Sequence, residues 1–275
     1  MLDWHGEHYI NGFARIRPSD AKVPILGLES KHIVQIFNNI VYTIWGNELT
    51  PLMTKILYTS IGASERTWNS LLESINDYIR KSKRDDIEAS GLALYNRLFP
   101  IKDALKAMDV KGHKVTSYVL KGQNIIIDLS LLDIKSKIAY AQSLVAYFYN
   151  YLRLRKDIDK KVMIFIDEAH NMFPKHRLEI PLPIEEAFIE ARKYGLRIIL
   201  ASAYPHKISH TVKFNSTTII AHQHTNQIDA EDTAKMLALS SYEIPHYAKL
   251  LQNLDTGEAI VKHKQMLSLV KVRKN

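Results

Sequence analysis

Two adjacent carboxylates, Asp167 and Glu168, are the residues of this sequence best suited to chemistry. They end an unbroken apolar run at 162–166. Asp167 offers the oxygen ligands that hold Mg²⁺, either directly or through the water molecules of the ion. Glu168 could orient or deprotonate a water molecule for attack on a phosphate group. The alternative is an ordinary strand that ends in solvated acids, and the motif by itself leaves both interpretations open.

The apolar run before the two acids predicts a strand that is buried on both faces, as in a parallel sheet covered by helices. Similar runs at 124–130 and 196–202 predict two further buried strands, and the apolar spacing at 136–152 predicts a long helix. The order strand, helix, strand indicates a right-handed crossover and parallel strands. Ligands of such sheets bind beyond the carboxyl ends of the strands, so the two acids are expected at the ligand-binding edge.

A block of helices interrupts the strands. Between residues 29 and 121 apolar residues recur at helical spacing, and Thr67 is a predicted N-cap. We therefore predict two parts, a core of residues 1–28 and 122–275 and a helical insertion of residues 29–121. Further elements are predicted near the end of the chain: a strand at 218–221, helices near 229–239 and 242–252, and a hairpin at 257–272.

The composition narrows the class of protein. The chain has 275 residues, of which 46% are hydrophobic and 24% charged, so it can bury a sizeable core. It lacks cysteine, which excludes disulfides and thiolate-bound zinc and favours an intracellular location. No apolar run is long enough to span a bilayer, and the first residues do not predict a secretory signal. The net charge of +8, with basic runs at 80–84 and 153–156, is typical either of a polyanion-binding protein or of one with scattered lysines.

Several motifs taken together resemble a known family. The sequence His-Gly-Glu occurs at 5–7, Ile-Ile-Ile-Asp-Leu-Ser at 125–130, and Phe-Ile-Asp-Glu-Ala-His at 165–170. Glu-Ala-Arg-Lys-Tyr-Gly-Leu-Arg-Ile-Ile-Leu-Ala-Ser follows at 190–202, and Gly-Glu-Ala-Ile-Val at 257–261. In this order they resemble the HerA-like branch of the FtsK/HerA motor ATPases, whose members move or unwind DNA as hexameric rings. The resemblance covers nearly the whole chain, although Asp-Glu-Ala-His alone is shared with many helicases.

The resemblance implies roles for particular residues. Asp167 corresponds to the Mg²⁺-associated acid of a Walker B motif, and Glu168 to the catalytic base. Arg192 stands where an arginine finger would reach into a neighbouring subunit, although a basic residue at a helix end is an equally good interpretation. The loop residues implied to lie near the nucleotide are Asp3, His5 and Glu7.

The sequence also departs from the family. None of its 10 glycines is followed by lysine, so the phosphate loop with its Gly-Lys pair is missing. In the family that loop precedes the strand of the His-Gly-Glu motif, so we expect it upstream of Met1, or lost in a derivative that does not bind nucleotide. The usual Ala-Thr-Gln-Arg-Pro is replaced by Ala-Ser-Ala-Tyr-Pro at 201–205, where Ser202 could keep part of the sensor role. A zinc site built from His5, His8, His222 and His224 is a further, less favoured interpretation.

The prediction is an α/β protein with a RecA-like parallel sheet flanked by helices and an inserted helical subdomain. Its predicted function is that of a subunit or fragment of a HerA-like hexameric motor ATPase, a cytoplasmic DNA translocase or helicase that uses ATP and Mg²⁺. Without the phosphate loop the 275 residues alone are expected to be inactive. The alternative is a nucleotide-independent DNA-binding or assembly protein derived from such an ATPase. The DNA process, and a nuclease or other process-specific partner, are left open.

Overall fold

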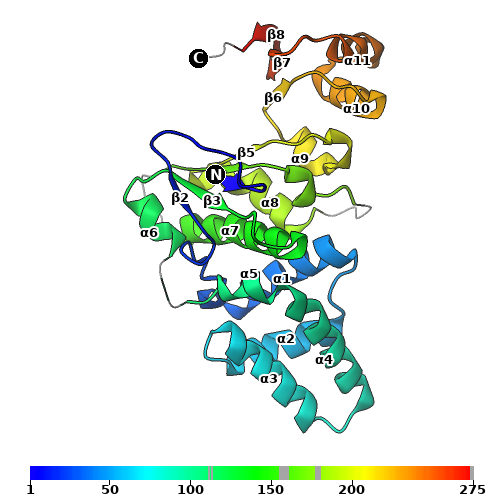
Figure 1. Cartoon of the computed structure of the whole chain (residues 1–275). Coiled ribbons are helices and arrows are strands. Elements are labelled where there is room, and N and C mark those ends of the chain that lie inside the picture. The colour runs from blue at the N-terminus through cyan, green and yellow to red at the C-terminus, as the bar shows by residue number, and fades with distance from the viewer. Residues whose placement is uncertain (111, 113, 155–160, 177–180, 273–275) are drawn as a thin grey trace. The chain divides into compact units, whose positions relative to one another are not determined.

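The computed structural model describes residues 1–110, 112, 114–154, 161–176 and 181–272 (Figure 1). The chain divides into two compact units. The first consists of Met1–Met172 and Ile180–Ala201, and the second of Phe173–Glu179 and Ser202–Asn275. The helices of residues 30–120 belong to the same unit as the parallel sheet. The division into a core and an insertion at residues 29–121 stays a prediction.

The first unit is built on a five-stranded parallel sheet with the order β2-β3-β1-β4-β5. Each strand pairs in parallel with its neighbours, so all the carboxyl ends lie at one edge. This confirms the α/β fold with a RecA-like parallel sheet. The strands are β1 (Leu2–Asp3), β2 (Ala14–Ile16), β3 (Ile125–Asp128), β4 (Val162–Ile166) and β5 (Leu196–Leu200).

The short strand β1 lies in the middle of this sheet, although it has only two residues. Leu2 is in register with Ile127 on one side and with Ile166 on the other. Backbone hydrogen bonds continue the pairing beyond the strand, from Leu129 N to Asp3 O at 2.9 Å and from Asp167 N to Leu2 O at 3.5 Å. The residues after β1 are thereby placed beside those that follow β4, although about 160 positions of sequence separate them.

Helices cover one side of the sheet. The long helix α7 (Ile134–Leu154) contacts β5, and it also packs against α1 (Ser30–Trp45) and α8 (Pro183–Glu190). Asp133 caps α7, because its Oδ1 accepts hydrogen bonds from Lys135 N and Ser136 N at 2.9 and 3.1 Å. The remaining helices of this unit are α2 (Pro51–Ala63), α3 (Trp68–Lys81), α4 (Asp85–Leu98), α5 (Lys102–Lys106) and α6 (Val115–Leu120). The predicted cap Thr67 is confirmed, since its side chain accepts from Ser70 N.

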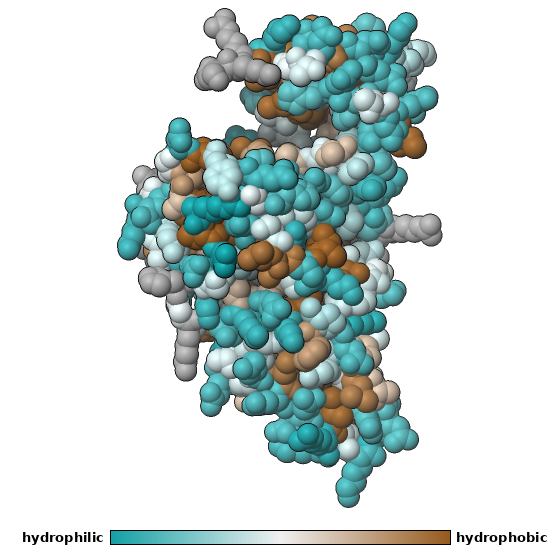
Figure 2. Space-filling view, in the orientation of Figure 1, coloured by the Kyte–Doolittle hydropathy of each residue, from teal (hydrophilic) through white to brown (hydrophobic). Residues whose placement is uncertain are grey.

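The other face of β4 and β5 is largely uncovered by the described residues. Met163 is 64% exposed and Ile199 is 42% exposed, whereas Val162, Ile164 and Ile166 are buried. The prediction that these strands are buried on both faces is therefore wrong. Both faces of β4 are apolar, but the helices in the described part of the chain cover only one of them. β5 is also an edge strand of the described sheet. In the view of Figure 2, apolar residues form separate groups among larger hydrophilic areas.

The second unit has its own antiparallel sheet, in the order β6-β7-β8. The predicted closing hairpin is confirmed as β7 (Glu258–His263) and β8 (Met266–Lys271), and the predicted strand at 218–221 is β6 (Thr218–Ala221), which pairs antiparallel with β7. Helices α10 (Gln227–Leu237) and α11 (Ile244–Gln252) bury a small apolar core against this sheet. Every helix in the described part of the chain is too short or too polar to traverse a lipid bilayer.

Candidate active site at the carboxyl ends of the strands

The two acids lie where the sequence predicted them, directly after β4. Glu168 adopts a left-handed backbone conformation with φ 49° and ψ 43°, which non-glycine residues rarely adopt and which costs of order 1 kcal/mol or more. Hydrogen bonds on both sides hold this turn: Glu168 N donates to Asp167 Oδ1 at 2.9 Å, and Ala169 N donates to Ala201 O at 2.9 Å. The turn leaves both carboxylates about one-fifth exposed, so solvent reaches them.

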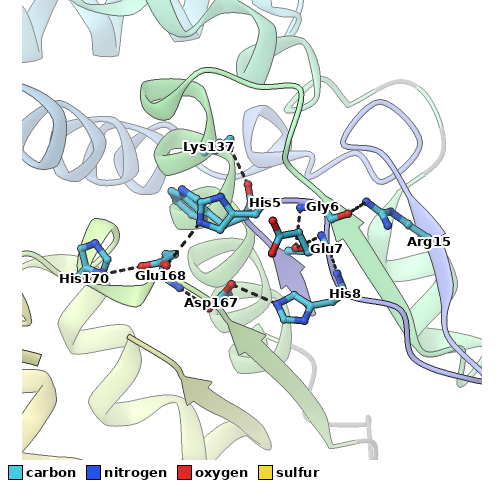
Figure 3. Close-up of polar contacts among 11 residues, drawn as sticks. His5, Gly6, Glu7, His8, Arg15, Lys137, Asp167, Glu168 and His170 are labelled. Atoms are coloured by element: carbon cyan, nitrogen blue, oxygen red, sulfur yellow. Dashed lines mark hydrogen bonds and ion pairs between the residues drawn. The ribbon is translucent and has the colours of Figure 1, made fainter. Parts of the chain in front are cut away.

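The loop after β1 is folded around the buried side chain of Asp3. Asp3 Oδ1 accepts hydrogen bonds from Gly6 N at 2.9 Å and Glu7 N at 3.4 Å, and Oδ2 accepts one from His8 N at 3.0 Å (Figure 3). The carboxylate itself is fully buried. Asp3 therefore acts as the anchor of the loop, while the side chains of His5, Glu7 and His8 are exposed.

The anchored loop brings two histidines to the two acids. His5 Nε2 lies 3.6 Å from Glu168 Oε1, and His8 Nε2 lies 3.4 Å from Asp167 Oδ2 (Figure 3). His170, two residues after Glu168, approaches its other oxygen, with Nδ1 3.2 Å from Oε2. Glu168 is thus held between two imidazoles. The sequence analysis considered His8 only as a zinc ligand and did not single out His170, although His170 completes the Asp-Glu-Ala-His motif.

A second group of contacts fixes the loop from the side of β2 and β3. Arg15 Nη2 donates to Gly6 O at 2.6 Å and to Asp128 Oδ2 at 2.7 Å. Burial raises the pKa of Asp128, but hydrogen bonds from Ser130 and Arg15 outweigh it and hold the pKa below its usual value. Gly6 has φ 78°, and a Cβ there would lie 2.9 Å from Arg15 Nη2. Glycine is therefore needed at this turn for both its backbone angle and its lack of a side chain.

The remaining predicted residues lie away from this cluster. Arg192 is exposed in the 3-10 turn η4 (Ala191–Tyr194), which precedes β5. Because β4 and β5 are parallel, Arg192 lies at the opposite end of the strands from Asp167 and Glu168, about 16 Å away along a five-residue pair. Ser202 follows β5 directly and begins the longer of the two segments of the second unit. Its Oγ accepts a hydrogen bond from Tyr204 N at 3.1 Å.

Within the described part of the chain, no group of three or more His, Asp or Glu side chains is arranged to hold a metal ion. The zinc interpretation combines His5 and His8 of the first unit with His222 and His224 of the second, and it stays a prediction. A magnesium ion has other requirements, since it is commonly bound by one or two carboxylates together with waters and substrate phosphates. Asp167, which is partly exposed at the carboxyl edge of the sheet, could supply one such carboxylate.

The model of one protein family matches residues 96–251, more than half of the chain, and is described as zonular occludens toxin, or Zot. The chain belongs to the Zot family. The match includes Asp167, Glu168, Arg192 and Ser202, and it begins after the loop of Asp3. No curated protein sequence is significantly similar to this Zot-family chain.

Solved structures share the fold of this Zot-family chain at low sequence identity. The bacterial conjugative coupling protein TrwB matches with a TM-score of 0.66 and 13% identity over 99% of this chain and 77% of its own. VirB4 of Thermoanaerobacter pseudethanolicus matches with a TM-score of 0.65 and 14% identity over 100% of this chain and 81% of its own. TrwB has also been solved in complex with the non-hydrolysable GTP analogue GDPNP. At these identities the likeness establishes the RecA-like fold.

Removal of the buried loop anchor should cost considerable stability. In Asp3→Ala three backbone N–H groups lose their acceptor, and we expect the free energy of unfolding to fall by about 2–4 kcal/mol. Urea denaturation followed by circular dichroism measures this difference. Asp20→Ala is the matched control, because Asp20 is exposed and nearby in the sequence, and its effect should stay within about 0.5 kcal/mol. Equal losses in the two variants would show that Asp3 does not anchor the loop.

Proposed function

We propose that this chain is the nucleotide-hydrolysing part of a DNA-moving motor of the HerA type, which works with ATP and Mg²⁺ as a ring of identical subunits, a hexamer. The observation that carries the proposal is the meeting of Asp167, Glu168 and the His5–His8 loop at the carboxyl edge of the parallel sheet. In open parallel sheets this edge is the usual site of ligand binding. The Zot family membership and the shared fold of TrwB and VirB4 support the same class.

Each side chain of the site has a distinct role in this proposal. Asp167 binds Mg²⁺, directly or through water, and Glu168 orients and deprotonates the attacking water. The ion, when bound, neutralises charge on the phosphates. His5 and His170 fix the Glu168 carboxylate from both sides, and Asp3 holds the loop that carries His5 and Glu7 near the nucleotide. Ser202 follows the neighbouring strand and takes part of the sensor role.

The uncovered part of the sheet suggests where a phosphate-binding unit would pack. No strand of the described residues pairs with the outer edge of β5, and Met163 and Ile199 are exposed on one face. A parallel strand beside β5 would pair with that edge, and the helix that follows it would cover the two apolar side chains. A glycine-rich loop between that strand and helix would lie at the same edge as Asp167 and Glu168. This proposal accounts for β4 being apolar on a face that the described residues leave open.

The alternative function is that of a nucleotide-independent DNA-binding or assembly protein that descends from such a motor. The observation in its favour is that none of the 10 glycines is followed by lysine. A dedicated nuclease or other partner for a particular DNA process stays a prediction under either function.

ATP binding and hydrolysis, with and without DNA, test the proposed function. For the 275 residues alone we expect weak binding of Mg-ATP by titration calorimetry and negligible hydrolysis, because no backbone cradle for the phosphates is encoded. The same measurement is made on the protein with any residues that its gene encodes before Met1. A glycine-rich loop ending in lysine and serine or threonine, with DNA-stimulated hydrolysis, is the expected result.

Two results would contradict these expectations in different ways. Micromolar binding by the 275 residues, with turnover abolished by Glu168→Gln, would show that they carry a phosphate site of another kind. An in-frame stop codon upstream, with no such loop and no hydrolysis, would exclude the motor and leave the nucleotide-independent function.

A further inference from the structure

The second unit presents exposed aromatic rings next to lysines in the segment that follows β5. Tyr204 is 44% exposed, and Phe214, at the end of α9 (His210–Phe214), is 77% exposed. The ammonium group of Lys207 lies over the Tyr204 ring, 4.3 Å from its centroid. The His210 and Phe214 rings are stacked with centroids 6.1 Å apart. Two aromatic positions, each beside a basic or imidazole side chain, therefore lie within eleven residues.

Hydrogen bonds to neighbouring elements hold this segment in place. His206 Nδ1 lies 2.6 Å from Oδ1 of Asp229, a buried residue of α10. His206 N donates to the same oxygen at 3.2 Å. Lys207 O accepts a hydrogen bond from Lys175 N at 2.7 Å, so the two lysines lie on adjacent backbone segments. An anchored segment loses less conformational entropy on binding a ligand than a loose loop does.

The charge of this surface is positive and is not compensated by the acids closest to it. Asp229 is paired with His206, and Asp232 is paired with Lys213 at 2.6 Å. Lys175 and Lys207 are exposed and form no ion pair with an acid of the described residues. Burial, followed by the nearby charges of Lys213 and Lys175, lowers the pKa of His210. A lowered pKa favours the neutral form of that ring, which is suited to stacking.

We propose that this surface, formed by Tyr204, Lys207, Lys175, His210 and Phe214, binds single-stranded DNA. The inference rests on the proposed function, which names DNA as the partner. It adds that the DNA is single-stranded and names the residues that contact it. Exposed aromatic rings stack on unpaired bases, whose faces are inaccessible in a duplex, and lysines contact the phosphates between them. Since stacking and phosphate contacts read no base edges, the binding should show little sequence preference.

The test is fluorescence anisotropy with a labelled oligonucleotide of about 20 thymidines and a duplex of the same length. The wild-type chain should bind the single strand more tightly, and its affinity should fall at least about tenfold between about 50 and 200 mM salt. Tyr204→Ala should weaken single-strand binding about tenfold or more, whereas Tyr204→Phe, which keeps the ring, should retain it. Lys207→Gln should reduce by about one the magnitude of the slope of log affinity against log salt concentration.

Matched controls lie elsewhere in the same unit. Tyr242 is 93% exposed, and Lys249 is exposed on α11, so Tyr242→Ala and Lys249→Gln remove a similar ring and a similar charge. Both should bind like the wild type. If Tyr204→Ala also binds like the wild type, or if the duplex binds as tightly as the single strand, this inference is wrong and DNA binding stands. If the wild type binds neither DNA, both the inference and the DNA partner of the proposed function are wrong.

Discussion

Glu168→Gln should lower the rate of DNA-stimulated ATP hydrolysis by about 10²–10⁴-fold, the usual contribution of a positioned general base. The measurement uses whichever form of the protein hydrolyses ATP in the test of the proposed function. Glutamine keeps the size of the side chain and can still approach His5 and His170, so the left-handed turn at Glu168 should persist. Its amide cannot accept a proton from water. The affinity for Mg-ATP should therefore change by less than about threefold, since the loss is in the transition state.

The matched control is Glu88→Gln, because Glu88 is an exposed carboxylate on α4, outside the site. We expect the control to hydrolyse ATP at the wild-type rate. Binding and turnover are measured on the same preparations, by titration calorimetry and by phosphate release. If Glu168→Gln retains more than about a tenth of the wild-type rate, Glu168 is not the base. If the variant instead loses ATP binding while the control does not, the Glu168 carboxylate contributes to the binding of Mg-ATP before hydrolysis. The proposed role as a general base is then wrong.

If Arg192 is an arginine finger, Arg192→Ala should lower the rate of ATP hydrolysis by about 10³–10⁵-fold, as much as Glu168→Gln or more. Arg192 is exposed at the end of the strands away from its own Asp167 and Glu168, so it can reach a site only in a neighbouring subunit. In a head-to-tail ring each site would take its acids from one subunit and its arginine from the next. Stability should be unchanged, because the side chain is exposed.

Mixed rings separate an arginine finger from an ordinary surface cation. Arg192→Ala and Glu168→Gln subunits are each inactive alone, but an equal mixture should form complete sites at about a quarter of the interfaces. ATP hydrolysis should therefore reappear on mixing, and Arg192→Ala mixed with wild type provides the reference. Lys193→Ala is the control, because Lys193 is exposed on the same turn and pairs with Glu190 at 3.0 Å. Full activity of Arg192→Ala, or no recovery on mixing, would remove the finger from the mechanism.

Local patterns in the sequence determined much of the secondary structure. The apolar run before Asp167 predicted β4, since consecutive apolar residues of that length favour a buried strand. Thr67 predicted the start of α3, because its hydroxyl satisfies a backbone N–H that the first turn leaves open. The parallel arrangement followed from the alternation of strands and helices. The position of Asp167 and Glu168 at the ligand-binding edge was predicted for the same reason, since their place depends on the strand that immediately precedes them.

The tertiary structure decided what those acids contact. The role of Asp3 as a buried anchor depends on β1 pairing with β3 and β4, which lie far along the chain. His8 and Asp167 are 159 positions apart and meet only because of that pairing. The sequence likewise could not predict the uncovered face of β4 or the separate antiparallel sheet that contains β6. The composition of an apolar strand does not show which sheet it joins or whether a helix covers each of its faces. Periodicity and capping depend on neighbours within a few residues. Strand order and register depend on hydrogen bonds between segments far apart in the sequence, and a local pattern does not show which segments pair.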